Sequence, residues 1–191
     1  NWIPDNNNCK GVVQIIHGMC EHVGRYDDFA EYLNEKGFVV TAFDLLGHGS
    51  SISDKRVGYF CRKDPATVLV KDVHRLKKIT EGLYPKIPYY ILGHSIGSLI
   101  LRNYLFKYAK GIKGAIILGT GNESLLGALK LKYISLTGMM LGKASQPADF
   151  LNKSVQGNYL KRVPGSKTQW DWLTKEDKAV DGFINDPKFL A

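Results

Sequence analysis

The chain has 191 residues, of which 44% are hydrophobic, and a formal net charge of +8. This length can bury one sizeable core, and no window holds the ~20 uninterrupted apolar residues that a membrane-spanning helix needs. Residues 1–119 carry 16 basic and 11 acidic side chains, and residues 120–191 carry 10 and 7. Because the charge is spread along the chain, with no basic stripe interleaved with aromatic residues, the sequence argues against a nucleic-acid partner.

The first residues lack the basic and then apolar pattern of a signal peptide. The three cysteines are an odd number without the spacing of a metal site. Both features fit a reducing compartment better than a disulfide-built secreted fold, so we expect a cytoplasmic protein.

Strand and helix patterns alternate as far as residue 118. Continuous apolar runs predict four strands, at residues 11–16, 38–43, 89–92 and 112–118. Apolar residues at helical spacing predict three helices between them, at residues 26–33, 65–83 and 99–106. In the second helix, one set of side chains should face the core: Leu69, Val73, Leu76 and Leu83. Its basic side chains should form a solvated face: Lys71, Arg75, Lys77 and Lys78. The alternation predicts an α/β fold with a parallel sheet covered on both faces.

The segment Gly93-His94-Ser95-Ile96-Gly97 joins the third strand to the third helix. This is the context that a G-x-S-x-G nucleophile elbow requires. Gly93 and Gly97 stand where the strained turn leaves no room for side chains. Ser95 would then stand at a helix N-terminus, where free N–H groups favour a developing anion. We therefore predict Ser95 as a nucleophile; the alternative is a glycine-rich turn with an incidental serine.

The segment His17-Gly18-Met19 follows the first strand directly. An HG turn after an early strand is where a hydrolase of this architecture carries its other oxyanion donor. Taken with the elbow, it predicts the backbone N–H groups of Met19 and Ile96 as the two donors. Taken alone, it would be a turn that ends a strand.

Three segments carry a family resemblance: HGMCEHVGRY at residues 17–26, DLLGHGSS at 44–51 and GHSIGS at 93–98. They resemble the HGxxEHxxRY, DxxGHGxS and GHSMGG signatures of the monoacylglycerol lipase and lysophospholipase branch of the α/β-hydrolases, of the serine aminopeptidase S33 type. Ile96 and Ser98 depart from the last signature. The resemblance covers roughly residues 11 to 120. It implies a mostly parallel sheet with helices on both faces, a cap inserted after the sixth strand, and no metal or organic cofactor.

From about residue 120 the alternation stops. An apolar row at helical spacing follows, made of Leu126, Leu129, Tyr133, Leu136 and Met140. The resemblance implies a hydrolase core at residues 1–121, a cap at 122–186 and the start of a return to the core at 187–191. The apolar row would then bind substrate, and the cap would be the part that touches a membrane surface. An ordinary peripheral helix packed on the sheet is the alternative.

A serine nucleophile needs a base and an orienting acid. All five histidines precede Ser95: His17, His22, His48, His74 and His94. In α/β-hydrolases the acid and the histidine follow the serine. Glu123 is a substitute acid, but it has no histidine to orient. We therefore expect the chain to be a fragment that lacks the C-terminal strands, and to be inactive alone.

The resemblance implies a serine hydrolase that cleaves carboxylic esters of single-chain lipids through an acyl-enzyme. Its substrate would be a monoacylglycerol or a lysophospholipid. One alternative is a serine peptidase of the proline-iminopeptidase kind, which should need an acidic anchor for a substrate amine. Another is a hydrolase-like binding module without catalysis.

Overall fold

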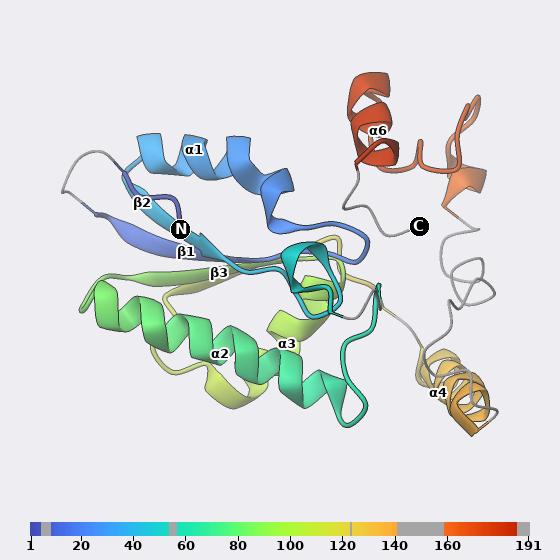
Figure 1. Cartoon of the computed structure of the whole chain (residues 1–191), viewed down its shortest axis with the longest axis horizontal. Coiled ribbons are helices and arrows are strands. Elements are labelled where there is room, and N and C mark those ends of the chain that lie inside the picture. Colours follow the sequence, from blue (N-terminus) through green and yellow to red (C-terminus); the bar gives the residue numbers. More distant parts are fainter. Residues whose placement is uncertain (5–8, 54–56, 123, 141–158, 187–191) are drawn as a thin grey trace. The chain divides into compact units, whose positions relative to one another are not determined.

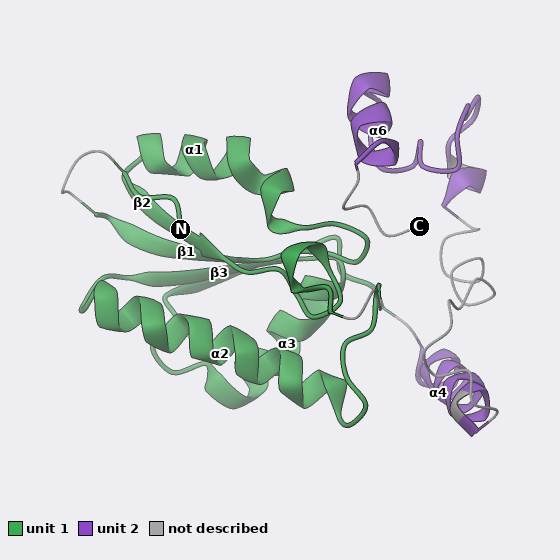
Figure 2. Ribbon diagram, viewed as in Figure 1, with its two compact units in different colours: residues 1–122, 190–191 green, residues 123–189 purple. Residues whose placement is uncertain are grey.

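The computed structural model of the chain describes residues 1–4, 9–53, 57–122, 124–140 and 159–186. The chain divides into two compact units, one built on residues 1–122 and one of residues 123–189 (Figure 2).

The first unit alternates between strand and helix, as the sequence predicts (Figure 1). Its strands are β1 (Gly11–Ile16), β2 (Phe38–Ala42), β3 (Tyr89–His94) and β4 (Gly114–Leu118). Its α-helices are α1 (Asp27–Glu35), α2 (Pro65–Leu83) and α3 (Ile96–Tyr108), and two short 3₁₀ helices are η1 (Val23–Tyr26) and η2 (Gly49–Ser51). The predicted and observed ends differ by a few residues, which is usual for element boundaries.

The four strands form one parallel sheet in the order β2-β1-β3-β4. Helix α1 covers one face, and α2 and α3 cover the other (Figure 1). Successive side chains of a strand point to opposite faces: Val13 and Ile15 of β1 pack with Ala30 of α1, whereas Val12 and Ile16 pack with residues of α2 and α3. Burial of both faces explains why β1, β2 and β3 read as continuous apolar runs. The predicted α/β fold, with helices on both faces of a parallel sheet, is confirmed.

The two edges of this sheet differ. At the β2 edge, the Trp2 N–H donates to Val40 O at 2.9 Å, and the Val40 N–H donates to Trp2 O at 3.0 Å. At the other edge, β4 pairs within the described residues only with β3, and Ile116 and Leu118 are 50% and 52% exposed. Among the described residues, Trp2 thus pairs with the β2 edge, and no strand pairs with the β4 edge.

Helix α2 begins as predicted but packs differently. The Asp64 carboxylate accepts the Thr67 N–H at 3.2 Å and caps the helix before Pro65. The predicted solvated position of Lys77 is wrong, because Lys77 is 3% exposed, and the predicted core position of Leu83 is wrong, because Leu83 is 61% exposed. Lys77 continues the buried stripe because its ammonium bonds Glu81 and lies 5.3 Å from the centre of the Tyr89 ring.

The second unit contains α4 (Leu125–Met140), the short η3 (Leu160–Arg162) and α6 (Asp177–Ile184). Aromatic rings pack within it, Tyr159 against Trp172 and Trp170 against Phe183. A cap at residues 122–186 stays a prediction, and the predicted return at 187–191 lies outside the described residues. Across the described part of the chain, no helix has the length and apolar character needed to cross a membrane.

Candidate active site

Ser95 stands at the junction of β3 and α3 in a strained backbone conformation. Its φ is 52° and its ψ is −118°, a region that costs a non-glycine residue of order 1–3 kcal/mol. The surroundings hold it there: the Ser95 N–H donates to Leu118 O at 2.9 Å, and the Ser98 hydroxyl donates to Ser95 O at 2.5 Å. The predicted strand–turn–helix context of Ser95 is therefore present.

The two glycines of the turn are required by close backbone approach. A Cβ on Gly93 would lie 2.5 Å from Gly97 O, and a Cβ on Gly97 would lie 2.2 Å from Ile16 O. Contacts this short are sterically forbidden, so both positions exclude any side chain. Through Gly97 the start of α3 lies directly against the end of β1.

The HG turn lies beside the elbow. A Cβ on Gly18 would lie 3.1 Å from the Ser95 Cβ, so the structure brings these two predicted segments together. Met19 follows Gly18 directly, and Ile96 is the first residue of α3, where a helix N–H has no acceptor within the helix. Two backbone segments that converge on Ser95 can supply an oxyanion site.

Two further side chains of the predicted motifs fix the loops behind the turn. The Leu45 N–H donates to His17 Nε2 at 2.8 Å, so His17 Nδ1 carries the proton and donates to Gly18 O at 2.7 Å. The Asp44 carboxylate accepts the Val23 N–H at 2.8 Å and the Ser50 N–H at 2.7 Å. These side chains act on loop geometry rather than on a reacting group.

Glu21 is the residue that the sequence analysis left without a role. It is 8% exposed, and its Oε1 accepts hydrogen bonds from Gly18 N–H, from Tyr26 OH at 2.9 Å and from His94 Nδ1 at 2.8 Å. Burial by itself raises the pKa of Glu21, but the His94, Gly18 and Tyr26 donors outweigh it and leave this pKa below its usual value. The available sequence signal was a glutamate three residues after the glycine of the HG turn.

His17 and His48 make the site sensitive to acid. Burial lowers the pKa of both histidines below 6.5, and the buried His48 Nε2 has no hydrogen-bond partner in the part of the chain that the structure describes. Between the folded-state pKa and 6.5 the unfolded chain binds more protons, so the protein loses stability as pH falls below about 6.5. We expect the free energy of unfolding in urea to fall between pH 7.5 and 5.5, with a limiting slope of about 1.4 kcal/mol per pH unit for each histidine.

The control is His48→Phe, which keeps an aromatic ring stacked on Phe60 but removes one titrating group. Its unfolding free energy should depend less steeply on pH over the same range. An unchanged slope in His48→Phe would show that His48 does not contribute to the acid sensitivity.

The other predicted site residues lie elsewhere. The apolar row Leu126, Leu129, Tyr133, Leu136 and Met140 lies exposed on α4, in the second unit, and its contact with substrate stays a prediction. Glu123 lies outside the described residues. No histidine among the described residues hydrogen-bonds to the Ser95 hydroxyl. Within the described ranges, no cluster of three His, Cys, Asp or Glu side chains could hold a metal ion.

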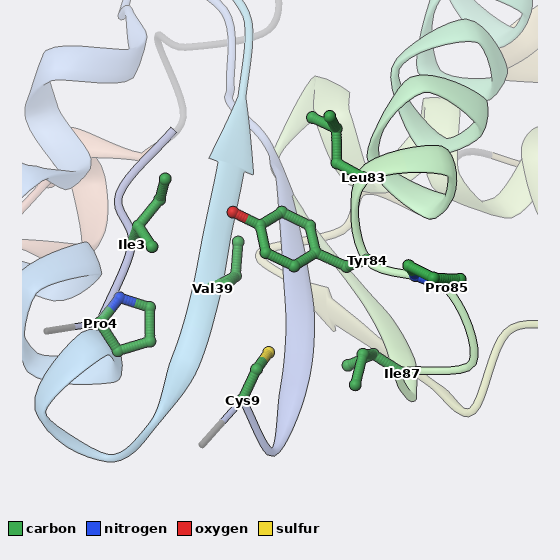
Figure 3. A pocket seen from close by; sticks show the side chains of 8 residues that line it. All are labelled: Ile3, Pro4, Cys9, Val39, Leu83, Tyr84, Pro85 and Ile87. Carbon is green, nitrogen blue, oxygen red and sulfur yellow. The ribbon is translucent and has the colours of Figure 1, made fainter. Parts of the chain in front are cut away.

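A hollow of about 280 Å³ lies near the amino ends of the strands (Figure 3). It is lined by Ile3, Pro4, Cys9, Val39, Leu83, Tyr84, Pro85 and Ile87. These residues precede or begin strands, whereas Ser95 follows the end of β3. The hollow is therefore separate from the elbow.

Comparisons with known proteins give one consistent result. The family model described as "Serine aminopeptidase, S33" matches residues 7–190. A monoglyceride lipase of Mus musculus is 30% identical over 161 residues, which cover 80% of this chain and 51% of the relative. A monoacylglycerol lipase of Mycolicibacterium smegmatis is 34% identical over 118 residues, covering 62% of this chain and 40% of the relative. The chain thus spans about half the length, or less, of these relatives.

A solved structure agrees. The thermostable carboxyl esterase from Bacillus coagulans, in complex with glycerol, superposes with a TM-score of 0.88 at 32% identity, over 98% of this chain and 60% of that one.

Proposed function

Since the chain belongs to the serine aminopeptidase S33 family of α/β-hydrolases, we propose that the protein is a serine hydrolase that cleaves carboxylic esters of single-chain lipids. The observation that carries the proposal is the conformation of Ser95: a strained turn at the N-terminus of α3, packed against the HG turn. Residues with strained backbone conformations cluster at active sites.

In the proposed mechanism the Ser95 hydroxyl attacks the ester carbonyl and forms a tetrahedral intermediate. The N–H groups of Met19 and Ile96 stabilise its oxyanion, each contributing on the order of 3 kcal/mol. Collapse of the intermediate expels the alcohol and leaves an acyl-enzyme, which water then hydrolyses to release the fatty acid. The positive end of the α3 dipole favours the same negative charge.

The base that removes the Ser95 proton is a separate part of the proposal. The five histidines precede Ser95, and none of the described ones bonds its hydroxyl. We propose that the base and its orienting acid belong to a part of the protein outside residues 1–191. Without them Ser95 is a neutral and weakly nucleophilic alcohol, so residues 1–191 alone should not turn over substrate.

Two observations support a lipid substrate. Two relatives are named monoglyceride lipase and monoacylglycerol lipase, and α4 exposes the apolar row from Leu126 to Met140. Exposed apolar rows of this kind bind apolar ligands or surfaces. Contact of the row with the acyl chain, and of the second unit with a membrane surface, belongs to the same proposal. A monoacylglycerol and a lysophospholipid both have the single chain that it requires.

The test uses the complete gene product and its Ser95→Ala variant, with exposed Ser166→Ala as the matched control. We expect wild type and Ser166→Ala to react with a fluorophosphonate probe and to hydrolyse monoacylglycerols. Ser95→Ala should fold, but its reaction with the probe and its hydrolysis of monoacylglycerols should each fall more than about 10³-fold. Circular dichroism checks folding, and mass spectrometry locates the probe.

Each other outcome overturns part of the proposal. A folded Ser95→Ala protein that keeps its activity removes Ser95 as the nucleophile. Faster hydrolysis of aminoacyl amides than of esters would favour a peptidase, the activity in the family's description. A folded wild type that neither reacts with the probe nor hydrolyses esters or amides would favour a binding module.

A further inference from the structure

The Glu21 carboxylate connects the two turns that converge on Ser95. One oxygen, Oε1, accepts the N–H of Gly18 from the HG turn and a hydrogen bond from His94 Nδ1 at 2.8 Å. Gly18 precedes the proposed donor Met19, and His94 precedes Ser95. Gly18 and His94, two of the partners of this oxygen, are therefore the chain neighbours of two groups that the proposed reaction uses.

The rest of the environment holds this oxygen in place. Tyr26 OH donates to the same Oε1 at 2.9 Å, and Arg25 Nε lies 3.7 Å from Oε2. The proton of His94 lies on Nδ1, because the Glu21 carboxylate beside it can only accept; this Nδ1 is also 3.2 Å from Tyr26 OH. The Glu21 side chain is 10% exposed, so little water competes for these bonds. Charge-assisted bonds of this kind are stronger than neutral ones.

We propose that Glu21 is a positioning residue that sets the distance between the oxyanion turn and Ser95. The inference rests on the proposed function and adds a residue to it. Glu21 touches neither substrate nor reacting atoms; it acts through Gly18 and His94. A small error in this separation lowers the rate strongly, because an oxyanion donor is effective only within hydrogen-bond distance of the developing charge.

The test compares Glu21→Gln with Tyr26→Phe in the complete gene product. Glutamine has nearly the shape of glutamate but no charge, and we expect kcat for an ester to fall about 10- to 100-fold while KM changes less than about threefold. Labelling of Ser95 by the fluorophosphonate should slow by the same factor. Tyr26→Phe removes one donor and leaves the carboxylate, so its kcat should fall less than about fivefold.

A double variant separates positioning from general stability. If Glu21 acts through His94, Glu21→Gln combined with His94→Gln should be no more than about threefold slower than the slower single variant. Rates are compared well below the unfolding temperature of every variant.

Unchanged kcat and labelling in folded Glu21→Gln would overturn the inference, while labelling of the wild type at Ser95 would leave the proposed function standing. The inference would also be overturned if the fall in kcat of the double variant equalled the product of the falls in the two single variants. A wild type that is never labelled at Ser95 would instead overturn the proposed function.

Discussion

Gly97→Ala is expected to disrupt the elbow and to abolish probe labelling of Ser95. The new Cβ would lie 2.2 Å from Ile16 O and 2.6 Å from His17 O. Both oxygens belong to backbone at the end of β1, which cannot rotate away as a side chain would. The start of α3 must therefore move away from the HG turn, which separates the two proposed oxyanion donors. We expect a loss of stability of about 3 kcal/mol, the upper end of overpacking costs, and a loss of labelling of more than about 100-fold.

The matched control is Gly82→Ala on α2, where a Cβ would meet nothing within 4 Å. This helix substitution should raise stability by about 0.5–1 kcal/mol, because alanine has the higher helix propensity. Urea unfolding and fluorophosphonate labelling measure both variants. A Gly97→Ala protein with wild-type stability and labelling would show that the elbow relaxes around the new methyl group.

The fold could be predicted from local pattern because both faces of the sheet are buried. Buried parallel strands are continuous apolar runs, and β1 and β3 follow this rule closely. Helix α3 and its turn were predictable because the turn has no room for a side chain at positions 93 and 97, and both residues are glycine. The elbow and the HG turn were paired from the motif order of hydrolases, and the structure explains the pairing, because strands β1 and β3 are neighbours in a parallel sheet. Their carboxyl ends therefore lie side by side.

The role of Glu21 could not be predicted by the same reasoning. Its bond to His94 joins residues 73 positions apart, and neither residue stands in a periodic pattern. Glu21 lies in the loop after the HG turn and His94 at the last position of β3, where side-chain direction follows from the local backbone geometry rather than from spacing. The identities of Met19 and Ile96 carry no signal either, because the groups proposed to act there are backbone N–H groups.

Helix α2 shows a different limit. Residue type assigns Lys77 to the solvated face, because lysine is rarely buried unless it is paired. Here the pairing exists: Lys77 bonds Glu81 one turn along the helix and lies over the Tyr89 ring at 5.3 Å. The neighbouring strand is also polar at this point, since Tyr89 OH donates to Gln14 Oε1 at 2.8 Å. A polar network thus replaces part of the apolar interface between α2 and the sheet, and hydropathy alone does not detect it.

This network predicts that substitutions of its two charged residues change the stability by different amounts. Glu81→Ala leaves the Lys77 ammonium buried without its carboxylate, whereas Lys77→Met removes the charge and keeps a chain of similar length. Breaking a fully buried pair costs about 3–5 kcal/mol, and replacing one by apolar residues is often neutral or stabilising. Because the Glu81 side chain is 32% exposed, water screens part of the effect, and we expect a cost of about 2 kcal/mol for Glu81→Ala. Lys77→Met should stay within about 1 kcal/mol of wild type.

Urea unfolding of both variants measures this difference, with Lys78→Ala as the exposed control. The Lys78 ammonium lies 3.4 Å from Glu81 Oε2, but its side chain is 65% exposed, so its loss should cost less than about 0.5 kcal/mol. Burial raises the pKa of Glu81, but the bond from Lys77 outweighs it and holds this pKa below 4.5. The penalty of Glu81→Ala should therefore be full above pH 4.5 and shrink as pH falls further, because Glu81 then becomes protonated in the wild type as well. If Lys77→Met is instead the more damaging substitution, the buried ammonium itself stabilises α2 on the sheet, and the polar network is worth more than the apolar contact it replaces.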